Sequence, residues 1–322
     1  MTRLSVAMCS CNREDYIAES LAALRLQTRS PDELVIADDG SRDGTIPIIE
    51  DFARAAPFPV RLLTNRGQRL GLARNYDRAI GACTGDVVAL CDDDDVWTPT
   101  KLARVLDVLE GPGAPLLVFS DAILVDRRLA PTGMTLWQAK GLKPSVPERH
   151  RERELFELLL RTNVAYTSTV AFRSELKAAA LPIPEVWKPD WWLTSLAAAT
   201  GRAVPIDAPL VEYRQHPLNA RGFGRRRPVQ QLSKVRLDNL AEYRLQVAQA
   251  SSLRTRLEAW GGAEGARILR LLDDKIGHLE TRIEMRGTTR PRRLALVAGE
   301  LLRGHYRRYS LGYRSALKDA AF

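Results

Sequence analysis

Residues 87–97 read VVALCDDDDVW, a short apolar run that leads into four consecutive aspartates. Val87–Leu90 has the length and the continuous apolar character of a strand that is covered on both faces. Trp97 and Pro99 follow the aspartates and anchor the chain on their other side. We therefore expect Asp92–Asp95 to lie at the carboxyl end of a buried strand.

Short apolar runs alternate with amphipathic stretches on both sides of this segment. Expected strands are Leu4–Met8, Glu33–Asp38, Val60–Leu63 and Val87–Leu90, and expected helices are Asp15–Gln27, Thr45–Ala55, Leu70–Ala82 and Pro99–Leu109. This order predicts a doubly wound α/β sheet. Further along we expect an irregular loop over Pro131–His150, helices over Glu152–Leu160 and Asp190–Ala199, and strands over Ser168–Phe172 and Leu210–Tyr213. From Val229 onward the pattern is nearly all helical.

Polar clusters follow three of the expected strands. They are Ser10–Arg13, Asp38–Ser41 and Asp92–Asp95. Open α/β sheets bind ligands just beyond the carboxyl ends of their strands, so we expect these loops to meet at one crevice.

Four adjacent carboxylates repel one another unless water or a cation screens their charges. Because an apolar strand and Trp97 flank the tract, we favour convergence on a cation over a solvated acidic loop. Hard oxygen ligands suit Mg²⁺ or Mn²⁺. Two other sites have plainer alternatives: Asp38–Gly40 is also typical of a tight turn, and Arg74 is also compatible with an ordinary surface position.

Several motifs together resemble a known family. They are Ser5–Arg13, Asp38–Thr45, Ala73–Asn75, Gly85–Trp97 and Lys101-Leu102, in this order. The set resembles family 2 of the glycosyltransferases. A second block, Asp190–Trp192 and Tyr213–His216 with Asn219 and Gly222, resembles a rhamnosyltransferase-like branch that builds bacterial surface polysaccharides.

The resemblance implies a GT-A fold, inversion at the anomeric carbon and a nucleoside diphosphate sugar as donor. It assigns donor-nucleotide contacts to Ser10, Cys11, Asn12, Arg13, Asp39, Arg74, Asn75, Asp92 and Asp93. It implies that Asp94 binds the metal, with Asp92 and His216 as further candidates, and that Asp95 supports them.

The resemblance also implies that Asp190 is the catalytic base, with Trp97, Trp191 and Trp192 on the acceptor side. The acceptor would be a saccharide or a lipid-linked saccharide. Two positions depart from the family pattern: Cys11 stands where an aromatic residue is frequent, and Pro189 precedes Asp190 where an acid is frequent. An alternative role for Asp190 is the N-cap of a helix, and an alternative for His216 is an ordinary loop residue.

The charge of the chain is uneven. Residues 221–322 carry 22 Lys and Arg against 10 Asp and Glu, although the whole chain has a net charge of +9. We expect a GT-A domain over residues 1–222, with a nucleotide-binding half (1–125) and an acceptor half (126–222). A basic helical extension follows over residues 223–322.

Two interpretations of this extension stay open: helices that pack on the body, or attachment to an anionic membrane surface. No nucleic-acid recognition motif is present. With no long apolar run and no secretory signal, we expect a cytoplasmic protein, peripheral at the inner face of the membrane if the second interpretation holds.

Two functions compete with sugar transfer. A nucleotidyltransferase shares an α/β nucleotide-binding body, but usually carries a Gly-rich phosphate loop after the first strand, where this chain has Ser10–Arg13. A non-catalytic nucleotide-sugar-binding protein would tolerate loss of Asp94 or Asp190. The four cysteines, at positions 9, 11, 83 and 91, are expected to be small buried side chains rather than metal ligands.

Overall fold

The structure is a computed structural model that describes residues 1–65, 68–113, 115–142, 152–216, 239–259 and 262–321. The chain forms two compact units, each considered by itself below. The first consists of Met1–Leu155 with Val164–Phe223, and the second of Phe156–Asn163 with Gly224–Phe322.

One nine-stranded sheet forms the centre of the first unit, in the order β3-β2-β1-β4-β8-β6-β9-β5, with β7 paired to β6. Its strands are β1 (Leu4–Ser10), β2 (Glu33–Asp38), β3 (Val60–Leu63), β4 (Val87–Asp92), β5 (Val96–Trp97), β6 (Leu117–Val125), β7 (Pro131–Thr135), β8 (Val170–Arg173) and β9 (Ala203–Arg214). β1 to β4 are parallel, and β8 runs antiparallel to both β4 and β6. The mixed α/β sheet confirms the predicted fold class.

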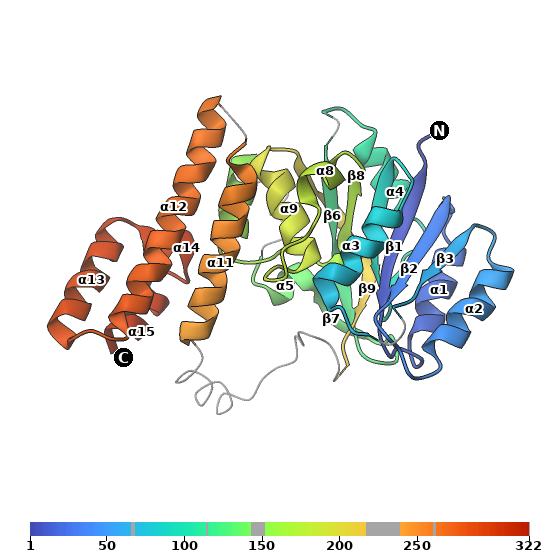
Figure 1. Cartoon of the computed structure of the whole chain (residues 1–322), viewed down its shortest axis with the longest axis horizontal. Coiled ribbons are helices and arrows are strands. Elements are labelled where there is room, and N and C mark those ends of the chain that lie inside the picture. Colours follow the sequence, from blue (N-terminus) through green and yellow to red (C-terminus); the bar gives the residue numbers. More distant parts are fainter. Residues whose placement is uncertain (66–67, 114, 143–151, 217–238, 260–261, 322) are drawn as a thin grey trace. The chain divides into compact units, whose positions relative to one another are not determined.

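Helices cover both faces of this sheet. They are α1 (Ile17–Arg25), α2 (Thr45–Ala55), α3 (Leu72–Ala82), α4 (Lys101–Leu109), α5 (Leu136–Ala139), α8 (Leu176–Ala180) and α9 (Pro189–Ala199). Ile17, Ile49 and Leu102 bring α1, α2 and α4 into one hydrophobic core with β1 and β2. α3 and α9 lie in front of the sheet in Figure 1 and close its other face. Cover on both faces explains why β1, β2 and β4 are apolar without alternation.

Three segments differ from the expectation. Of the loop expected over Pro131–His150, residues 131–135 form β7 and residues 136–139 form α5, while residues 143–150 lie outside the described part. The strand expected at Leu210–Tyr213 begins at Ala203, because β9 pairs with β6 over a longer stretch. β5 and α8 were not expected, since two- and five-residue elements leave little periodicity to detect.

The second unit is helical where it is described. It contains α11 (Asn239–Leu257), α12 (Gly262–Met285), α13 (Arg290–Leu302), α14 (His305–Tyr309) and α15 (Tyr313–Ala321). A buried hydrogen-bond network joins three of these helices: His278 and His305 both contact the Glu300 carboxylate. These contacts outweigh the effect of burial and lower the pKa of Glu300 to about 2. No helix in the described part of the chain is both long and apolar enough to cross a membrane.

The second unit also includes part of a helix that we expected in the first domain. α7 (Glu152–Leu159) enters it at Phe156. There Lys275 Nζ donates to the Leu160 carbonyl at 2.7 Å, and Arg267 lies 3.3 Å from Glu157. The domain boundary expected after residue 222 lies outside the described residues and stays a prediction.

Candidate active site

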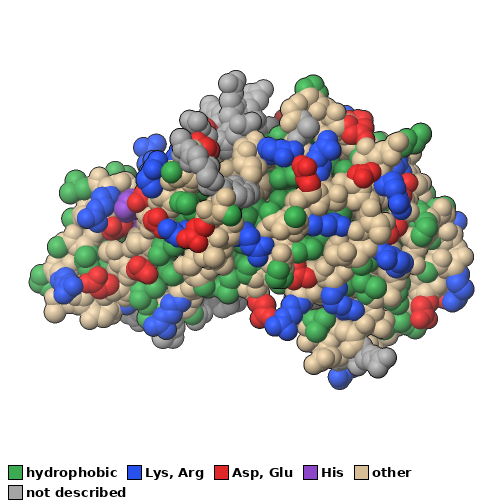
Figure 2. Space-filling view, turned by 45° about the horizontal axis from the view of Figure 1, so that its top comes forward, with side chains coloured by type: hydrophobic (Ala, Val, Ile, Leu, Met, Phe, Trp, Pro, Cys, Tyr) green, Lys and Arg blue, Asp and Glu red, His purple; other side chains and the backbone are tan. Residues whose placement is uncertain are grey.

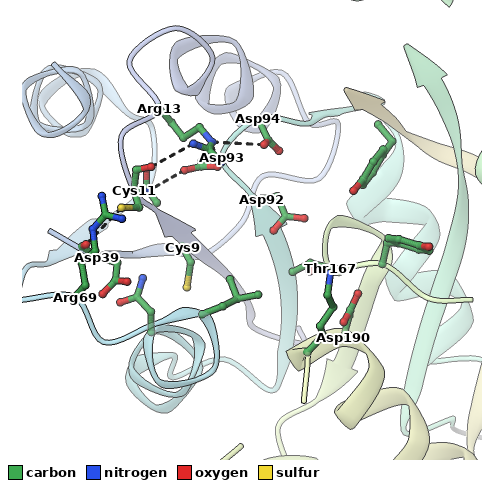
Figure 3. A pocket seen from close by; sticks show the side chains of 16 residues that line it. Cys9, Cys11, Arg13, Asp39, Arg69, Asp92, Asp93, Asp94, Thr167 and Asp190 are labelled. Carbon is green, nitrogen blue, oxygen red and sulfur yellow. Dashed lines mark hydrogen bonds and ion pairs between the residues drawn. The ribbon is translucent and has the colours of Figure 1, made fainter. Parts of the chain in front are cut away.

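A cavity of about 330 Å³ opens where the strand order of the sheet reverses, between β1 and β4 (Figure 3). Cys9 of β1 stands beside Asp92 of β4 in the register, so both strands end at this point. Nine of the residues predicted from the sequence line the cavity: Ser10, Cys11, Arg13, Asp39, Asn75, Asp92, Asp93, Asp94 and Asp190. The expectation that three polar loops converge is therefore met, while the role of each residue stays a prediction.

The four aspartates of the tract turn in different directions. Asp92 accepts a hydrogen bond from the Tyr76 hydroxyl at 3.0 Å. Asp93 accepts the backbone N–H of Cys11 at 3.2 Å and lies 3.4 Å from the Arg13 guanidinium. Asp95 points away from the cavity and accepts the backbone N–H of Arg214. Three carboxylates are thus left to face the cavity, and Asp93 ties the end of β4 to the end of β1.

Asp94 is one of the residues that line the cavity (Figure 3), and it contacts His216. Its Oδ2 is 2.9 Å from Nε2 of His216, although 122 positions separate the two residues in the sequence. The imidazole stacks on the Tyr16 ring, with centroids 4.5 Å apart, and its side chain is fully buried. Contacts with Asp94 and Tyr16 thus hold His216 beside the tract, and a role in metal binding stays a prediction.

The carboxylates of the cavity are electrostatically crowded. Burial, followed by the charges of Asp94 and Asp190, raises the pKa of Asp92 to about 7. Burial and the charge of Asp94 likewise raise the pKa of Asp93 and of Asp95. A bound cation would offset the repulsion between these carboxylates and favour their ionised forms.

Asp38 and Asp39 divide two tasks at the end of β2. Asp38 accepts the backbone N–H groups of Gly40 and Ser41, at 3.0 and 2.8 Å, and so forms the tight turn that was one of the two alternatives. Asp39 lines the cavity and accepts the backbone N–H groups of Leu70 and Gly71. Asp39 therefore holds the start of α3 against the site.

Asp190 comes from the other half of the sheet. It lies in the first turn of α9, is 3% exposed, and lines the cavity on the side opposite β1 (Figure 3). Lys188, rather than Asp190, is the N-cap residue of α9, and no side-chain cap forms there. Asp190 thus lies inside the helix rather than at its N-cap, and its Oδ1 accepts the N–H of Trp191 at 2.7 Å. Its role as the base stays a prediction.

Besides His216 and Asp95, five predicted site residues do not line the cavity. Arg74 is 62% exposed in its side chain and pairs with Glu185 on the surface. Asn12 links two loops: its N–H donates to Ser41 Oγ, and its Oδ1 accepts the N–H of Arg42. The remaining three are the predicted acceptor-side tryptophans.

The tryptophans serve packing. Trp97 is 3% exposed, with the Lys101 ammonium 4.8 Å from its ring centroid. Trp192 is fully buried, and its indole N–H donates to the Ala180 carbonyl at 2.8 Å. Trp191 contacts the ring of Trp187 edge-on. Trp97 and Trp192 are therefore buried in the core, whereas Trp191 is partly exposed.

Seven lining residues were missed: Cys9, Arg69, Leu72, Tyr166, Thr167, Lys188 and Tyr213. Lys188 could have been found, because it stands two positions before the predicted base. Leu72 lies at the start of α3 and is 50% exposed. Tyr166 and Thr167 precede β8 in a segment with no motif to mark it.

A parallel half-sheet with carboxylates at its switch point, continued by antiparallel strands, defines the GT-A class of glycosyltransferases. The sequence profile of glycosyl transferase family 2 matches residues 5–171, and the chain belongs to this family.

The chain is similar to several named proteins. An uncharacterized glycosyltransferase of Nostoc sp. is 30% identical over 227 residues, which cover 67% of this chain and 66% of that protein. An uncharacterized protein of Mycobacterium tuberculosis is 29% identical over 217 residues, which cover 66% of this chain and 59% of that protein. The match thus spans less than two thirds of the length of these relatives.

Solved structures show the same fold. Staphylococcus aureus TarS in complex with UDP-GlcNAc superposes with a TM-score of 0.59 at 15% identity, covering 86% of this chain and 72% of that one. A mannosyltransferase of Pyrobaculum calidifontis in complex with GDP-Man and Mn²⁺ gives 0.56 at 18% identity, covering 99% and 86%.

Proposed function

We propose that this glycosyltransferase is inverting and metal-dependent, and that it moves a sugar from a nucleoside diphosphate sugar to a hydroxyl group of its acceptor. The observation that carries the proposal is that carboxylates from two halves of the sheet face one cavity. Asp92–Asp94 approach it from β4, and Asp190 approaches from α9. This arrangement leaves room for a donor diphosphate on one side and an acceptor on the other.

Asp94 would hold the divalent cation, with His216 and Asp92 as further ligands. The fit rests on the donor set: a carboxylate oxygen and an imidazole nitrogen 2.9 Å apart, with a second carboxylate of raised pKa nearby. Oxygen-rich sets with one imidazole suit Mg²⁺ or Mn²⁺. The bound cation would neutralise the charge that grows on the leaving diphosphate.

The nucleotide would lie along the ends of β1 and β2. Ser10, Cys11, Asn75 and Asp39 line this side, and Arg13 contributes a guanidinium for the donor phosphates. Arg69, which the sequence did not point to, lies beside Cys11 and Asp39 in Figure 3 and adds a second cation.

Asp190 would accept the proton of the acceptor hydroxyl as that oxygen attacks carbon 1 of the sugar. The Lys188 side chain lines the same part of the cavity and lowers the pKa of Asp92, against the stronger effects of burial and neighbouring carboxylates. The positively charged Lys188 side chain would attract the anionic donor and hold it close to Asp190.

The acceptor would be a saccharide or a lipid-linked saccharide in bacterial cell-surface polysaccharide or glycolipid assembly, reached from the cytoplasmic side by peripheral attachment to the membrane. One relative supports this: a β-1,3-glucosyltransferase of Escherichia coli, named for its action on α-D-GlcNAc-diphosphoundecaprenol, is 30% identical over 106 residues. That match covers 33% of this chain and 40% of the relative.

Asp94→Asn tests the metal site. We expect it to abolish transfer and to weaken Mn²⁺-dependent nucleotide binding by at least about tenfold, because an amide is a poor ligand for a hard cation. Isothermal titration of nucleoside diphosphates, with and without Mn²⁺, measures this directly. Asp107→Asn, an exposed position on α4, is the matched control. Equal nucleotide affinity of the Asp94 and Asp107 variants in Mn²⁺ would refute the metal role.

Asp190→Asn tests the base. We expect kcat to fall by about 10²- to 10⁴-fold with unchanged donor binding, since only proton removal is lost. Nucleotide sugars are first screened by thermal shift with Mn²⁺ to identify the donor, and transfer is then followed with it. A variant that keeps wild-type turnover would exclude Asp190 as the base while leaving the metal site intact.

A further inference from the structure

A second cavity, of about 400 Å³, lies within the C-terminal unit and has cationic walls. Four basic side chains line it: Arg161, Arg282, Arg314 and Lys318. No Asp or Glu is among the lining residues in the described part of the chain. Such a cavity attracts an anion.

The floor of this cavity is preorganised. Arg282 is 6% exposed and donates to Asp319 at 2.6 Å and to Ser310 Oγ at 2.9 Å. Its guanidinium also lies over the Tyr243 ring, 4.3 Å from the centroid. A buried guanidinium fixed on three sides keeps one orientation, which is characteristic of a built site and unlike mobile surface arginines.

Beneath the cavity, one buried carboxylate contacts two arginines. Asp319 is shared by Arg282 and Arg286, the latter at 2.9 Å. Lys318 lies nearby, and burial together with the charges of Arg286 and Arg282 lowers its pKa. Arg282 and Arg286 thus share the Asp319 carboxylate, while Arg161, Arg314 and Lys318 add positive charge to the cavity wall.

The cationic surface continues into an adjoining cavity of about 490 Å³. Arg161 lines both cavities, and its guanidinium donates to the Arg307 carbonyl at 3.3 Å. Arg303, Arg307 and Arg308 line the second cavity, with Glu157 as its acid. The basic surface is therefore broad enough to meet several anionic groups at once.

Large apolar side chains are exposed beside these cations. Leu311 lines the 400 Å³ cavity and is 80% exposed. On α15, Tyr313 and Leu317 are 79% and 72% exposed and one helical turn apart, next to Arg314 and Lys318. Lys and Arg side chains mixed with hydrophobic ones are visible over the surface of this unit in Figure 2.

The combination of basic and exposed apolar side chains favours a lipid over a soluble anion as the ligand. A soluble phosphate would use the arginines but would leave Leu311 and Leu317 in water. A lipid surface offers phosphate to the cations and hydrocarbon to the leucines, which is how amphipathic interfacial helices bind. We propose that the 400 Å³ cavity binds the phosphate headgroup of an anionic membrane lipid, with Leu311, Tyr313 and Leu317 inserted at the headgroup boundary.

This inference rests on the proposed attachment to the membrane and gives it a site. The full-length protein is floated with vesicles of equal parts phosphatidylcholine and phosphatidylglycerol, and with pure phosphatidylcholine, at low salt. We expect binding to the anionic vesicles, and a reduction of at least about tenfold in the Arg314→Gln/Lys318→Gln double variant, since each basic residue near an anionic surface contributes about a factor of five.

The matched control is Arg290→Gln/Arg292→Gln, which removes the same charge from exposed positions of α13 that line neither cavity. We expect it to keep most of the vesicle binding. Equal loss in both double variants would show non-specific attraction and overturn the site. Absence of wild-type binding to anionic vesicles would overturn it as well.

Further measurements distinguish a lipid headgroup from a soluble anion. Others check that the variants remain folded. Leu311→Ser/Leu317→Ser should weaken vesicle binding while leaving every cation in place. Inorganic phosphate should compete no better than chloride at equal ionic strength; strong competition would assign the cavity to a soluble anion. Asp94→Asn should bind vesicles like the wild type, and the Arg314/Lys318 variant should keep Mn²⁺-dependent nucleotide binding, so failure of one proposal does not imply failure of the other.

Discussion

Lys101 is a charged side chain placed where charge is costly. It is fully buried at the start of α4, and its ammonium has no hydrogen-bond partner among the described residues. Burial lowers its pKa from 10.5 to about 7, although Cys91 and Asp95 act in the opposite direction. The Lys101 ammonium lies 4.8 Å from the centroid of the Trp97 ring.

The lowered pKa predicts a pH dependence of stability. Between about pH 7 and pH 10.5 the unfolded chain holds a proton on Lys101 that the folded chain has lost. The free energy of unfolding should therefore rise with pH across this window, by about 1.4 kcal/mol per pH unit from this group. Below pH 7 both states are protonated, and the contribution is constant.

Lys101→Met removes that slope while keeping the aliphatic stem, and it should raise the melting temperature at pH 7. Urea unfolding at several pH values between 7 and 9.5 measures both effects. Lys275→Met is a useful contrast, because Lys275 donates to the Leu160 carbonyl. Leaving that acceptor unpaired should cost about 1–3 kcal/mol. A Lys101 variant with an unchanged slope would show that another group titrates in this window.

The approach of β1 to β4 depends on a glycine. A Cβ built on Gly85 would lie 2.8 Å from the Arg3 carbonyl oxygen and 2.8 Å from the Ser5 backbone nitrogen. These contacts are with main-chain atoms, which cannot rotate aside. Gly85 lies just before the amino end of β4, whereas Ser10 and Asp92 stand at the carboxyl ends of the two strands.

Gly85→Ala should therefore lower stability by about 1–3 kcal/mol, because overpacking forces β1 and β4 apart. Gly81→Ala is the control: it lies in α3 with no atom within 4 Å of the new Cβ, and should stabilise by about 0.5–1 kcal/mol. Thermal unfolding of the two variants tests the pair, and equal melting temperatures would contradict the close approach.

The two units of the chain carry different surfaces for different ligands. The cavity at the strand ends is rich in carboxylates, whereas the cavities of the C-terminal unit are rich in arginine. Mass action predicts that each ligand stabilises the region that binds it.

Hydrogen exchange measured by mass spectrometry should separate the two regions. Mn²⁺ with the nucleoside diphosphate that raises the melting temperature most should slow exchange around residues 9–13 and 92–95, and leave α14 and α15 unchanged. Anionic vesicles should give the opposite pattern. Protection that spreads equally through both units with one ligand would show that they respond as one body.

Much of the first unit was predictable because its signals are local. β2, β3 and α2 begin and end at the residues expected, since continuous apolar runs and a helical period are visible within a dozen positions. Convergence of Ser10, Asp39 and Asp92 followed as well, because parallel strands end at the same edge of a sheet. Polar residues directly after buried strands are thus readable as a site.

Other features depend on packing between distant segments. Nothing local places His216 on Asp94, Lys188 near Asp92, or Tyr213 in the cavity wall. Successive helical residues point about 100° apart, so Asn75 faces the cavity while Arg74 faces the surface. Which residue faces the cavity depends on how α3 packs on β1 and β2. The order of residues thus determined a doubly wound sheet with a carboxylate site, because both follow from short-range periodicity and strand polarity. Tertiary structure decided which cations, rings and imidazole complete the site, because those contacts depend on how helices and strands far apart in the chain pack together.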